Sequence, residues 1–373
     1  MAGLAAPRPA AGLSTGPTTI REVAFHSARS ALSRPIADAT HAIPGIRFIV
    51  ARIALAGGVV GESHLLAFHY SPHAIAGACR DLEAFLRGRD ASDTRSVIRD
   101  WDVESEYFGR MGVNRWMLGL ANLAMWDARG KLAGAPVWRL LGGSARPVPV
   151  YGSGGWLSYT DDELVDEVTG YARRGFRAVK VKVGAKEPGR DLERLRRVRA
   201  AVGPGVRVMM DANQGFAPEG AIALAHAARG LGIGWFEEPV DHRDFDGYAR
   251  VREASGVPIA MGEREYDTVA LRELHRRRAI DLWQPDLLRL GGVEGWRASA
   301  AVARELGVPV LPHYYRDYDV PLLCTIDNGA GAESFDWIDA IVDAPMRVDD
   351  GHALPRESPG WGFSIRDEVL EAP

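Results

Sequence analysis

Short β-strand patterns recur at a nearly constant interval in the second half of the chain, and this recurrence constrains the fold most. The candidate strands are Val179–Val183, Val206–Asp211, Trp235–Glu237, Ile259–Glu263, Leu282–Trp283 and Val308–Leu311. They recur about every 23 to 29 residues, and a helical stretch fills each interval. We therefore expect an α/β fold, a (β/α)7–8 TIM-type barrel of parallel strands. No G-x-G-x-x-G follows the first strand, which weakens the Rossmann alternative.

The N-terminal third has a different pattern and predicts a separate α+β domain. Apolar residues alternate in Ile20–Phe25 and again in Arg47–Leu55, which is typical of antiparallel strands, and a long loop joins them. The segment Arg115–Ala133 has the wide apolar face of a buried helix. A glycine pair at 142–143 then ends the helical region, and the strand Val148–Tyr151 follows. The expected division is a disordered tail over residues 1–19, a capping domain over 20–143 and a barrel over 144–334.

Composition excludes several classes of function. The formal net charge of -4 is small for 373 residues, and the arginines are interspersed with acids, so a nucleic-acid partner is not expected. No apolar run reaches the length of a membrane span. The first twenty residues lack the basic and apolar regions of a signal peptide, and two cysteines are too few for a disulfide framework. A cytoplasmic protein without a membrane or nucleic-acid partner is the expectation.

Each candidate strand ends near a residue that can bind a metal ion or move a proton. These residues are Lys182, Asp211, Glu237, Glu263, Asp286 and His313, separated by 29, 26, 26, 23 and 27 positions, and Glu333 follows 20 positions later. The carboxyl ends of barrel strands meet at one mouth, where such enzymes carry their active sites. The spacing therefore predicts that these side chains share one site.

Three consecutive strands end in carboxylates, at Asp211, Glu237 and Glu263. Three negative charges at one mouth repel one another unless a cation neutralises them. Ligands that are all oxygen suit a hard ion, and Mg²⁺ also leaves positions open for substrate oxygens. A single acid at a strand end is commonly a helix cap or an ion-pair partner, but three in a row favour a magnesium site.

The strand AVKVKVG places Lys180 and Lys182 on one face and its valines on the other. Two lysines inside a barrel are expected to depress each other's pKa, which produces an amine able to act as a base. An exposed amphipathic edge strand is the alternative. Asn213 has the same spacing from Asp211 and is expected to face the mouth as well.

Asp286 and His313 lie one βα unit apart. A carboxylate at that distance can hold the imidazole in one tautomer and raise its basicity. Histidine alone is more often structural, so the prediction rests on the pair.

These residues carry a resemblance to the enolase superfamily, in its mandelate racemase subgroup. The matching motifs are K-x-K (Lys180, Lys182), D-A-N (Asp211–Asn213), F-E-E-P (Phe236–Pro239), M-G-E (Met261–Glu263), Q-P-D (Gln284–Asp286), G-G-V (Gly291–Val293), P-H (Pro312, His313) and Glu333. The resemblance covers roughly residues 151–333 in motif detail. It implies that the N-terminal region caps the barrel, that residues 335–373 return to this cap, and that the protein is a homo-oligomer.

The resemblance also implies roles for the residues on one side of the site. Asp211, Glu237 and Glu263 would hold Mg²⁺, which binds the carboxylate of a small-molecule substrate. Lys182 would be the base on one face of the α-carbon, and Lys180 would lower its pKa and contact the carboxylate.

On the other side, the resemblance implies that His313, oriented by Asp286, serves the opposite face of the α-carbon. Glu333, if protonated, would donate a hydrogen bond to the developing enediolate. The Lys or His base with Mg²⁺ is a known pattern of this superfamily.

The sequence departs from mandelate-type members in the groups expected to contact substrate. Arg264 directly follows Glu263, and Tyr315 and Arg316 belong to an unusually polar and aromatic run. These groups suit a polyhydroxylated or diacid substrate, although either arginine could pair with a nearby aspartate. The cap loop, about residues 29–41, is expected to add specificity.

The leading hypothesis is a dehydratase that converts an acid sugar, an aldonate or aldarate, into a 2-keto-3-deoxy acid. A racemase or epimerase of a 2-hydroxy acid is the alternative, and it uses the same residues. A metal-dependent hydrolase is disfavoured because the three ligands include no histidine. A non-catalytic binding protein is disfavoured by the complete set of polar groups at the strand ends.

Overall fold

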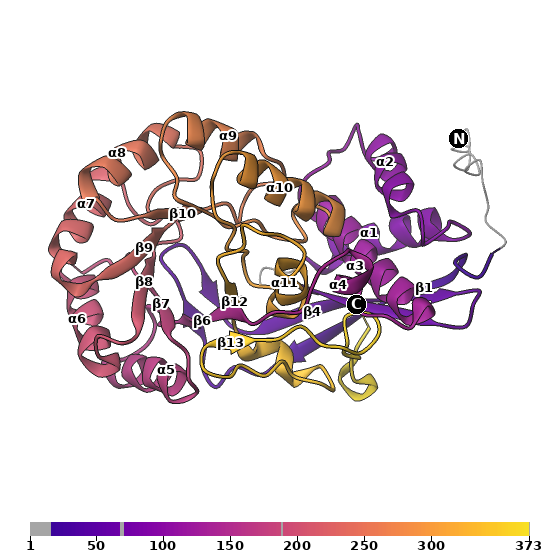
Figure 1. Cartoon of the computed structure of the whole chain (residues 1–373), viewed down its shortest axis with the longest axis horizontal. Helices are drawn as coiled ribbons and strands as arrows, with labels where there is room; N and C mark the ends of the chain where they lie inside the picture. Colours follow the sequence, from indigo (N-terminus) through magenta and orange to yellow (C-terminus); the bar gives the residue numbers. More distant parts are fainter. Residues whose placement is uncertain (1–15, 68–70, 188, 373) are drawn as a thin grey trace.

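Parallel strands at the centre of the molecule curl into the barrel that the sequence periodicity predicts (Figure 1). The computed structural model describes residues 16–67, 71–187 and 189–372. The barrel strands are β6 (Val148–Gly154), β7 (Ala178–Lys182), β8 (Arg207–Asp211), β9 (Ile233–Glu237), β10 (Ile259–Met261), β11 (Leu282–Trp283) and β12 (Ala332–Ser334). Their order in the sheet is β11-β10-β9-β8-β7-β6-β12.

Residues 308–313 close the ring between β11 and β12. Val310 forms parallel bridges with Trp283 on one side and with Gly329 on the other. The predicted strand Val308–Leu311 is therefore present only as isolated bridges, and a further bridge joins residues 286 and 313. Proline lacks the backbone N–H that a ladder needs, and positions 309 and 312 are prolines, which explains the weak pairing.

Helices surround the barrel, as Figure 1 shows on its left side. They are α5 (Asp161–Arg173), α6 (Arg190–Val202), α7 (Pro218–Ala227), α8 (Phe245–Ser255), α9 (Val269–Arg276), α10 (Val293–Glu305) and α11 (Arg316–Leu323), with a short 3₁₀ turn η1 (Arg229–Leu231). The outward-facing valines of β7, Val179 and Val181, are buried in the main hydrophobic core. This packing between strands and helices is the reason that the β7 lysines point inward.

Strand alternation sorts the inward-facing side chains into levels along the barrel axis. On β7, Ala178 borders the lower end, where the strands begin, and Lys180 and Lys182 border the upper end. Between the ends lies a separate hydrophobic cluster of Tyr151, Met209, Trp235, Ala260 and Leu311, which we call the apolar layer. The layer separates two cavities inside the same barrel.

The N-terminal domain is a three-stranded antiparallel sheet packed against helices. Its strands are β1 (Ile20–Ser30), β4 (Ile46–Leu55) and β5 (Val60–Leu66), in the order β1-β4-β5. Its helices are α1 (Pro72–Leu86), α2 (Thr94–Glu104), α3 (Val113–Ala133) and α4 (Val137–Leu140). The helix predicted over Arg115–Ala133 is α3, which packs on β4 and β5.

The cap is joined to the barrel through Glu294 at the start of α10. Its carboxylate accepts hydrogen bonds from Asn122 Nδ2 at 2.7 Å and from Trp126 Nε1 at 3.1 Å. Both donors belong to α3. A charged acceptor with two donors is a strong contact, so the cap helix is fixed against the barrel.

The C-terminal segment returns to the cap, as expected. It contains η2 (Asp336–Ala340), β13 (His352–Ala353) and η3 (Asp367–Val369). Ser27 and Glu371 exchange two backbone hydrogen bonds, of 2.9 and 2.7 Å. The Trp361 indole donates to the carbonyl of Leu123 at 2.9 Å. On the way, β13 pairs antiparallel with β6.

Three expected segments differ in detail from the structure. The loop between the first two strands is partly regular, because β1 extends to Ser30 and the loop contains the short pair β2 (Ile36–Ala37) and β3 (Ala42–Ile43). Residues 1–15 of the predicted tail lie outside the described residues, whereas Thr19 forms a bridge with Asp90. No helix among the described residues has the length and apolar character that crossing a membrane requires.

Candidate active site

The upper cavity lies between the carboxyl ends of the barrel strands and the cap. Its volume is about 170 Å³. The barrel contributes charged and polar groups to its walls, namely Lys180, Lys182, Asn213, Glu263, Arg264, Asp286, Arg289, His313, Tyr314, Tyr315 and Glu333. The cap contributes Asp38, His41, Ile43, Leu65, Leu66, Ala67 and Trp116. The walls thus combine both signs of charge in a small enclosed space.

The three predicted metal ligands follow one another around the ring. Asp211 and Glu237 are the last residues of β8 and β9 and are register partners. Glu263 follows β10 after Gly262, whose φ of 140° is favourable only for glycine. A Cβ at position 262 would lie 2.8 Å from the Trp283 ring. The exposed fractions of Asp211, Glu237 and Glu263 are 0%, 1% and 7%.

The two lysines of β7 are bound to these carboxylates. Lys182 Nζ lies 2.6 Å from Asp211 Oδ2. Lys180 Nζ lies 2.5 Å from Glu237 Oε1, 3.3 Å from Asp211 Oδ2 and 2.7 Å from Glu333 Oε1. Burial lowers the pKa of both lysines, but the surrounding carboxylates raise it by more, so each pKa lies above its ordinary value. Lys180 lowers the pKa of Lys182, as expected, but the carboxylates outweigh this effect, so the expected net depression of the lysine pKa is wrong for the protein's own side chains.

The carboxylate cluster fits a hard cation. Burial raises the pKa of Glu237 to about 8, and the negative charge of Asp211 adds to this shift while Lys180 opposes it. The Oδ1 atom of Asn213 and the Oε1 atom of Glu238 are buried oxygens without a hydrogen-bond partner among the described residues. These oxygen donors, with no cysteine among them, are the ligands that Mg²⁺ prefers.

The carboxylates are not gathered into a closed metal shell. Across residues 16–67, 71–187 and 189–372, no group of three His, Cys, Asp or Glu side chains is already arranged around a common metal position. The reason is visible in the contacts of the ligands. Asp211 and Glu237 face lysine amines, and Glu263 faces Arg264 and His313 at 3.5 and 3.4 Å.

His313 and Asp286 form the expected pair. His313 Nδ1 lies 2.9 Å from Asp286 Oδ2, and the other carboxylate oxygen accepts the backbone N–H groups of Leu288 and Arg289. The imidazole Nε2 is thereby directed toward Glu263. Burial lowers the pKa of His313, but Glu263 and Asp286 outweigh it and raise the pKa above its ordinary value.

Glu333 lies on β12 beside Lys180. Its Oε2 accepts the backbone N–H of Tyr314 at 2.9 Å. Burial raises the pKa of Glu333, but Lys180 and His313 lower it by more, so the side chain is a carboxylate in these surroundings. Glu333 can donate the predicted hydrogen bond only when it is protonated, and Lys180 and His313 disfavour its protonation.

The predicted substrate contacts do not all reach the cavity. Asn213, Arg264 and Tyr315 line it. Arg264 Nε also lies 3.0 Å from Glu238 Oε2, a buried ion pair behind the carboxylate cluster. Arg316 does not line the cavity, because its guanidinium is buried and held by Ser334 and Asp339.

The cap loop over about residues 29–41 was expected to contribute specificity, but sequence reasoning did not single out which of its residues line the cavity, and it missed Arg289. Asp38 and His41 come from the cap loop and lie 3.3 Å apart, whereas Arg29, near the end of β1, pairs with Glu371 at 3.1 Å. Arg289 donates to the backbone carbonyl of Glu263. Its position three residues after Asp286, in the turn that Asp286 caps, was a usable signal. For the cap residues, no local pattern in the sequence distinguishes them from their neighbours.

Comparisons with known proteins agree with this geometry. A family model described as "Enolase C-terminal domain-like" matches residues 163–369, and one described as "Mandelate racemase / muconate lactonizing enzyme, N-terminal domain" matches residues 20–142. The chain is 36% identical over 338 residues to an arabinonate dehydratase of Saccharolobus solfataricus, covering 87% of this chain and 90% of that protein.

Two solved structures are similar over nearly the whole chain. One is a racemase from Streptomyces coelicolor A3(2) with bound magnesium, at a TM-score of 0.89 and 28% identity, covering 94% of this chain and 99% of that one. The other is an L-talarate dehydratase from Polaromonas sp. JS666 complexed with Mg and L-glucarate, at a TM-score of 0.86 and 28% identity, covering 94% and 96%.

Proposed function

Because the chain belongs to the enolase superfamily, in the mandelate racemase subgroup, we propose that it is a dehydratase of acid sugars. The reaction removes the α-proton of an aldonate or aldarate and then eliminates the β-hydroxyl as water, which yields a 2-keto-3-deoxy acid. One observation carries this proposal: Lys182 and His313 border the same cavity from strands that lie on either side of the three-carboxylate cluster.

The cofactor of this site is Mg²⁺, held by Asp211, Glu237 and Glu263. When bound, it neutralises these carboxylates, which lowers the pKa of the neighbouring lysines, and it stabilises the charge that develops on the substrate carboxylate. Lys182 then takes the proton from the α-carbon. Lys180, at the centre of the cluster, contacts the substrate carboxylate and holds Glu333 in place.

His313 completes the elimination. Its Nε2–H protonates the β-hydroxyl as the C–O bond breaks, so the electron pair of the former C–H bond forms the C=C bond and water leaves. The resulting enol takes up a proton at C3 and loses the proton of its C2 hydroxyl, so C2 becomes a ketone. Asp286 holds Nδ1 and so keeps Nε2 directed at the cavity throughout.

The cavity supports a polyhydroxylated substrate. Asp38, His41, Asn213 and Arg264 offer donors and acceptors around the proposed reaction centre. Buried polar groups in a site favour a substrate with hydroxyls that pair with them. A substrate without these hydroxyls would leave the groups unpaired, which weakens its binding. The similarity to an arabinonate dehydratase further supports an aldonate as the first substrate to examine.

A racemase is the second candidate. The similarity to a structure described as a racemase favours it, and both reactions begin with the same proton transfer. In that case His313 returns a proton to the α-carbon from the opposite face instead of protonating a leaving hydroxyl.

The test is a screen of acid sugars, beginning with arabinonate and glucarate, in D₂O with Mg²⁺. We expect proton NMR to show loss of the α-proton signal and a keto-acid assay to show product. Deuterium at an inverted α-carbon, without keto acid, would establish the racemase instead. No α-proton exchange with any acid sugar would contradict both candidates.

Two variants with matched controls test the proposed roles of Lys182 as the base and His313 as the acid. Lys182→Ala is expected to abolish exchange, whereas Lys186→Ala, at a nearby exposed lysine, should not. His313→Asn is expected to abolish keto-acid formation, with His275→Asn on the outer face of α9 as its control. Full dehydration by His313→Asn would remove His313 from the proposed role.

A further inference from the structure

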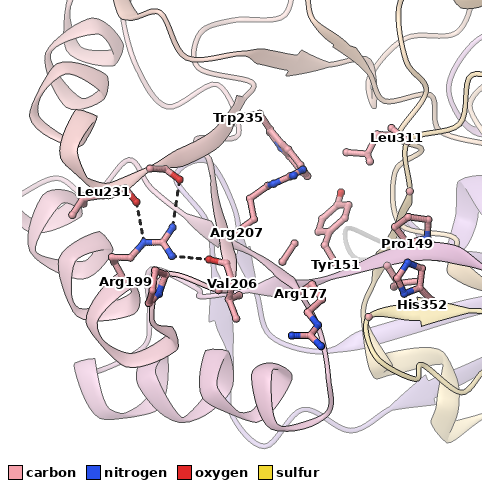
Figure 2. Close-up of a pocket in the computed structure, with 18 of the residues that line it drawn as sticks. Pro149, Tyr151, Arg177, Arg199, Val206, Arg207, Leu231, Trp235, Leu311 and His352 are labelled. Carbon is pink, nitrogen blue, oxygen red and sulfur yellow. Dashed lines mark hydrogen bonds between the residues drawn. The ribbon is translucent and has the colours of Figure 1, made fainter.

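A second cavity lies at the opposite end of the barrel, where the strands begin (Figure 2). Its volume is about 910 Å³, much larger than that of the upper cavity. The lining residues come from the first positions of β7 and β8, from the loops before β9 and β12, and from the start of β13. The apolar layer forms its roof, since Tyr151, Trp235 and Leu311 belong to both.

The lining of this lower cavity has one sign of charge. It contains Arg177, Arg199, Arg207 and His352, and none of its described lining residues is Asp or Glu. Arg199 is committed to the fold, because it donates to the backbone carbonyls of residues 203, 206, 231 and 232. Arg177 Nε donates to Asp350 Oδ1 at 2.9 Å.

Arg207 differs from these arginines. Among the described residues, its guanidinium forms no hydrogen bond or ion pair with another side chain or a carbonyl, and the side chain is exposed to solvent. Its aliphatic part lies over Gly234, where a Cβ would meet Arg207 Cδ at 2.7 Å. Figure 2 shows the side chain extending from β8 toward Trp235. Arg207 is exposed at the start of β8, so its charge is available to a ligand that enters the cavity.

Two buried donors face the same cavity. The Tyr151 hydroxyl and the Trp235 indole N–H have no hydrogen-bond partner among the described residues, although the side chains are only 3% and 5% exposed. The two rings meet edge to face, with centroids 5.3 Å apart. A buried donor without an acceptor is destabilising, so an acceptor supplied by a ligand would be favourable here.

From this geometry we propose that the lower cavity binds a small organic carboxylate. The carboxylate lies between the Arg207 guanidinium and the Trp235 N–H. The apolar body of the ligand packs against the wall formed by Val206, Leu231 and Leu311. Donors without acceptors exclude a cation, and the apolar wall favours an organic anion over inorganic phosphate.

The site is independent of the reaction proposed above. It shares no lining residue with the upper cavity, and the apolar layer lies between the two, with the Tyr151 ring of this layer centred 5.7 Å below Lys180 Nζ. The probe is therefore an aromatic carboxylate without an α-proton, sodium benzoate, which the upper site cannot turn over.

The test is isothermal titration calorimetry of benzoate into the full Mg²⁺-loaded chain at constant ionic strength. We expect saturable binding to the wild type and about a tenfold or larger loss of affinity in Arg207→Gln, since a hydrogen bond to a charged group is removed. Trp235→Phe, which removes the indole N–H and keeps an aromatic ring, should also weaken binding. Arg207→Lys should retain part of the affinity.

Two control variants decide where benzoate binds. Arg196→Gln removes an exposed arginine on α6 that lines neither cavity, and Lys182→Ala alters the upper site; both should bind benzoate as the wild type does. Three results would overturn the proposal: no saturable binding to the wild type, a loss in Lys182→Ala without a loss in Arg207→Gln and Trp235→Phe, or an equal loss in Arg196→Gln. If Arg207→Gln does not fold, Trp235→Phe alone decides the matter.

Discussion

The two ends of the barrel are built by the same strands, but they differ in the charge of their lining residues and in the size of their cavities. At the upper end, Lys182 and Asp211 belong to a dense cluster of opposite charges in a cavity of about 170 Å³. At the lower end, Arg207 borders a cavity of about 910 Å³ in which no described lining residue is acidic. On β8, only Val208, Met209 and Met210 separate Asp211 from Arg207.

This contrast shows what a barrel strand offers. Inward-facing positions recur at every second residue, so one strand presents side chains to two sites with an apolar level between them. Charged groups at the upper end are mutually paired, which holds them in fixed positions before substrate arrives. The lower end has unpaired donors, which is the pattern of a binding site that awaits an acceptor.

The largest effect that would sharpen this contrast is expected at the upper end. Lys182→Ala should lower turnover of an acid-sugar substrate by about 10³-fold, within the usual range for a general base. Arg207→Gln should leave turnover within about twofold, because it contacts no group of the upper site. Steady-state kinetics on both variants makes the comparison, and a similar loss in both would break it.

The contact between the cap and the barrel, outside both cavities, should make the stability depend on pH. His64 of β5 is 1% exposed and stacks on Tyr318 with centroids 4.8 Å apart, in the contact between cap and barrel. Burial lowers the pKa of His64 to about 4, while Asp317 partly opposes this shift and Arg356 adds to it. The unfolded chain takes up a proton below about pH 6.5 and the folded chain does so only below about 4. The free energy of unfolding should therefore fall by roughly 3 kcal/mol between these values as pH decreases.

His64→Phe should remove this contribution and flatten the decrease. Urea unfolding at pH 7 and at pH 4.5 measures it, with His352→Gln at the exposed rim of the lower cavity as the control. An unchanged pH dependence in His64→Phe would show that other groups dominate.

The orientation of His313 provides a third test of the upper end. Asp286→Asn can keep the bonds to the backbone N–H groups of Leu288 and Arg289, but it weakens the hold on Nδ1. Turnover should fall about 100-fold, with a smaller change in KM, because a misplaced catalytic group loses rate without losing substrate contacts. Asp327→Asn, at an exposed ion pair with Arg304, should change neither quantity. A fall in KM alone would argue against the orienting role.

The smallest effect is expected at the lower rim. Arg177 and Asp350 form an ion pair in which both side chains are 68% exposed. Exposed pairs contribute little, so Arg177→Gln should change the free energy of unfolding by less than about 0.5 kcal/mol in urea. A change of several kcal/mol would show that the rim is a structural part of the barrel, and the contrast between the two ends would weaken.

The sequence predicted the upper end well because its signals are periodic. Residues such as Asp211 and Glu237 recur at a fixed interval, and the barrel topology alone brings them together. Arg316 shows the limit of this reasoning. It stands next to the polar run after His313, but the start of α11 turns its side chain toward Asp339. The direction of a side chain at the start of such a short helix depends on tertiary contacts that have no local pattern in the sequence.

The lower end was not predicted for a different reason. Arg177 and Arg207 stand beside strand starts, where an arginine usually belongs to a solvated flank. Only the three-dimensional arrangement shows that Arg207 lies over Gly234 and near the unpaired Trp235 indole. The lysine pKa was also mispredicted, because two lysines considered alone repel, whereas the folded protein surrounds them with carboxylates.

The apolar layer has a consequence for how such a protein changes over generations. Substitutions at sites that are well separated and share no partner have nearly additive effects. Met209, Ala260 and Leu311 place such a separation across the middle of the barrel. Substitutions in the residues that determine substrate specificity at one end can therefore accumulate without changing ligand binding at the other end. The two ends can then diverge under separate selection.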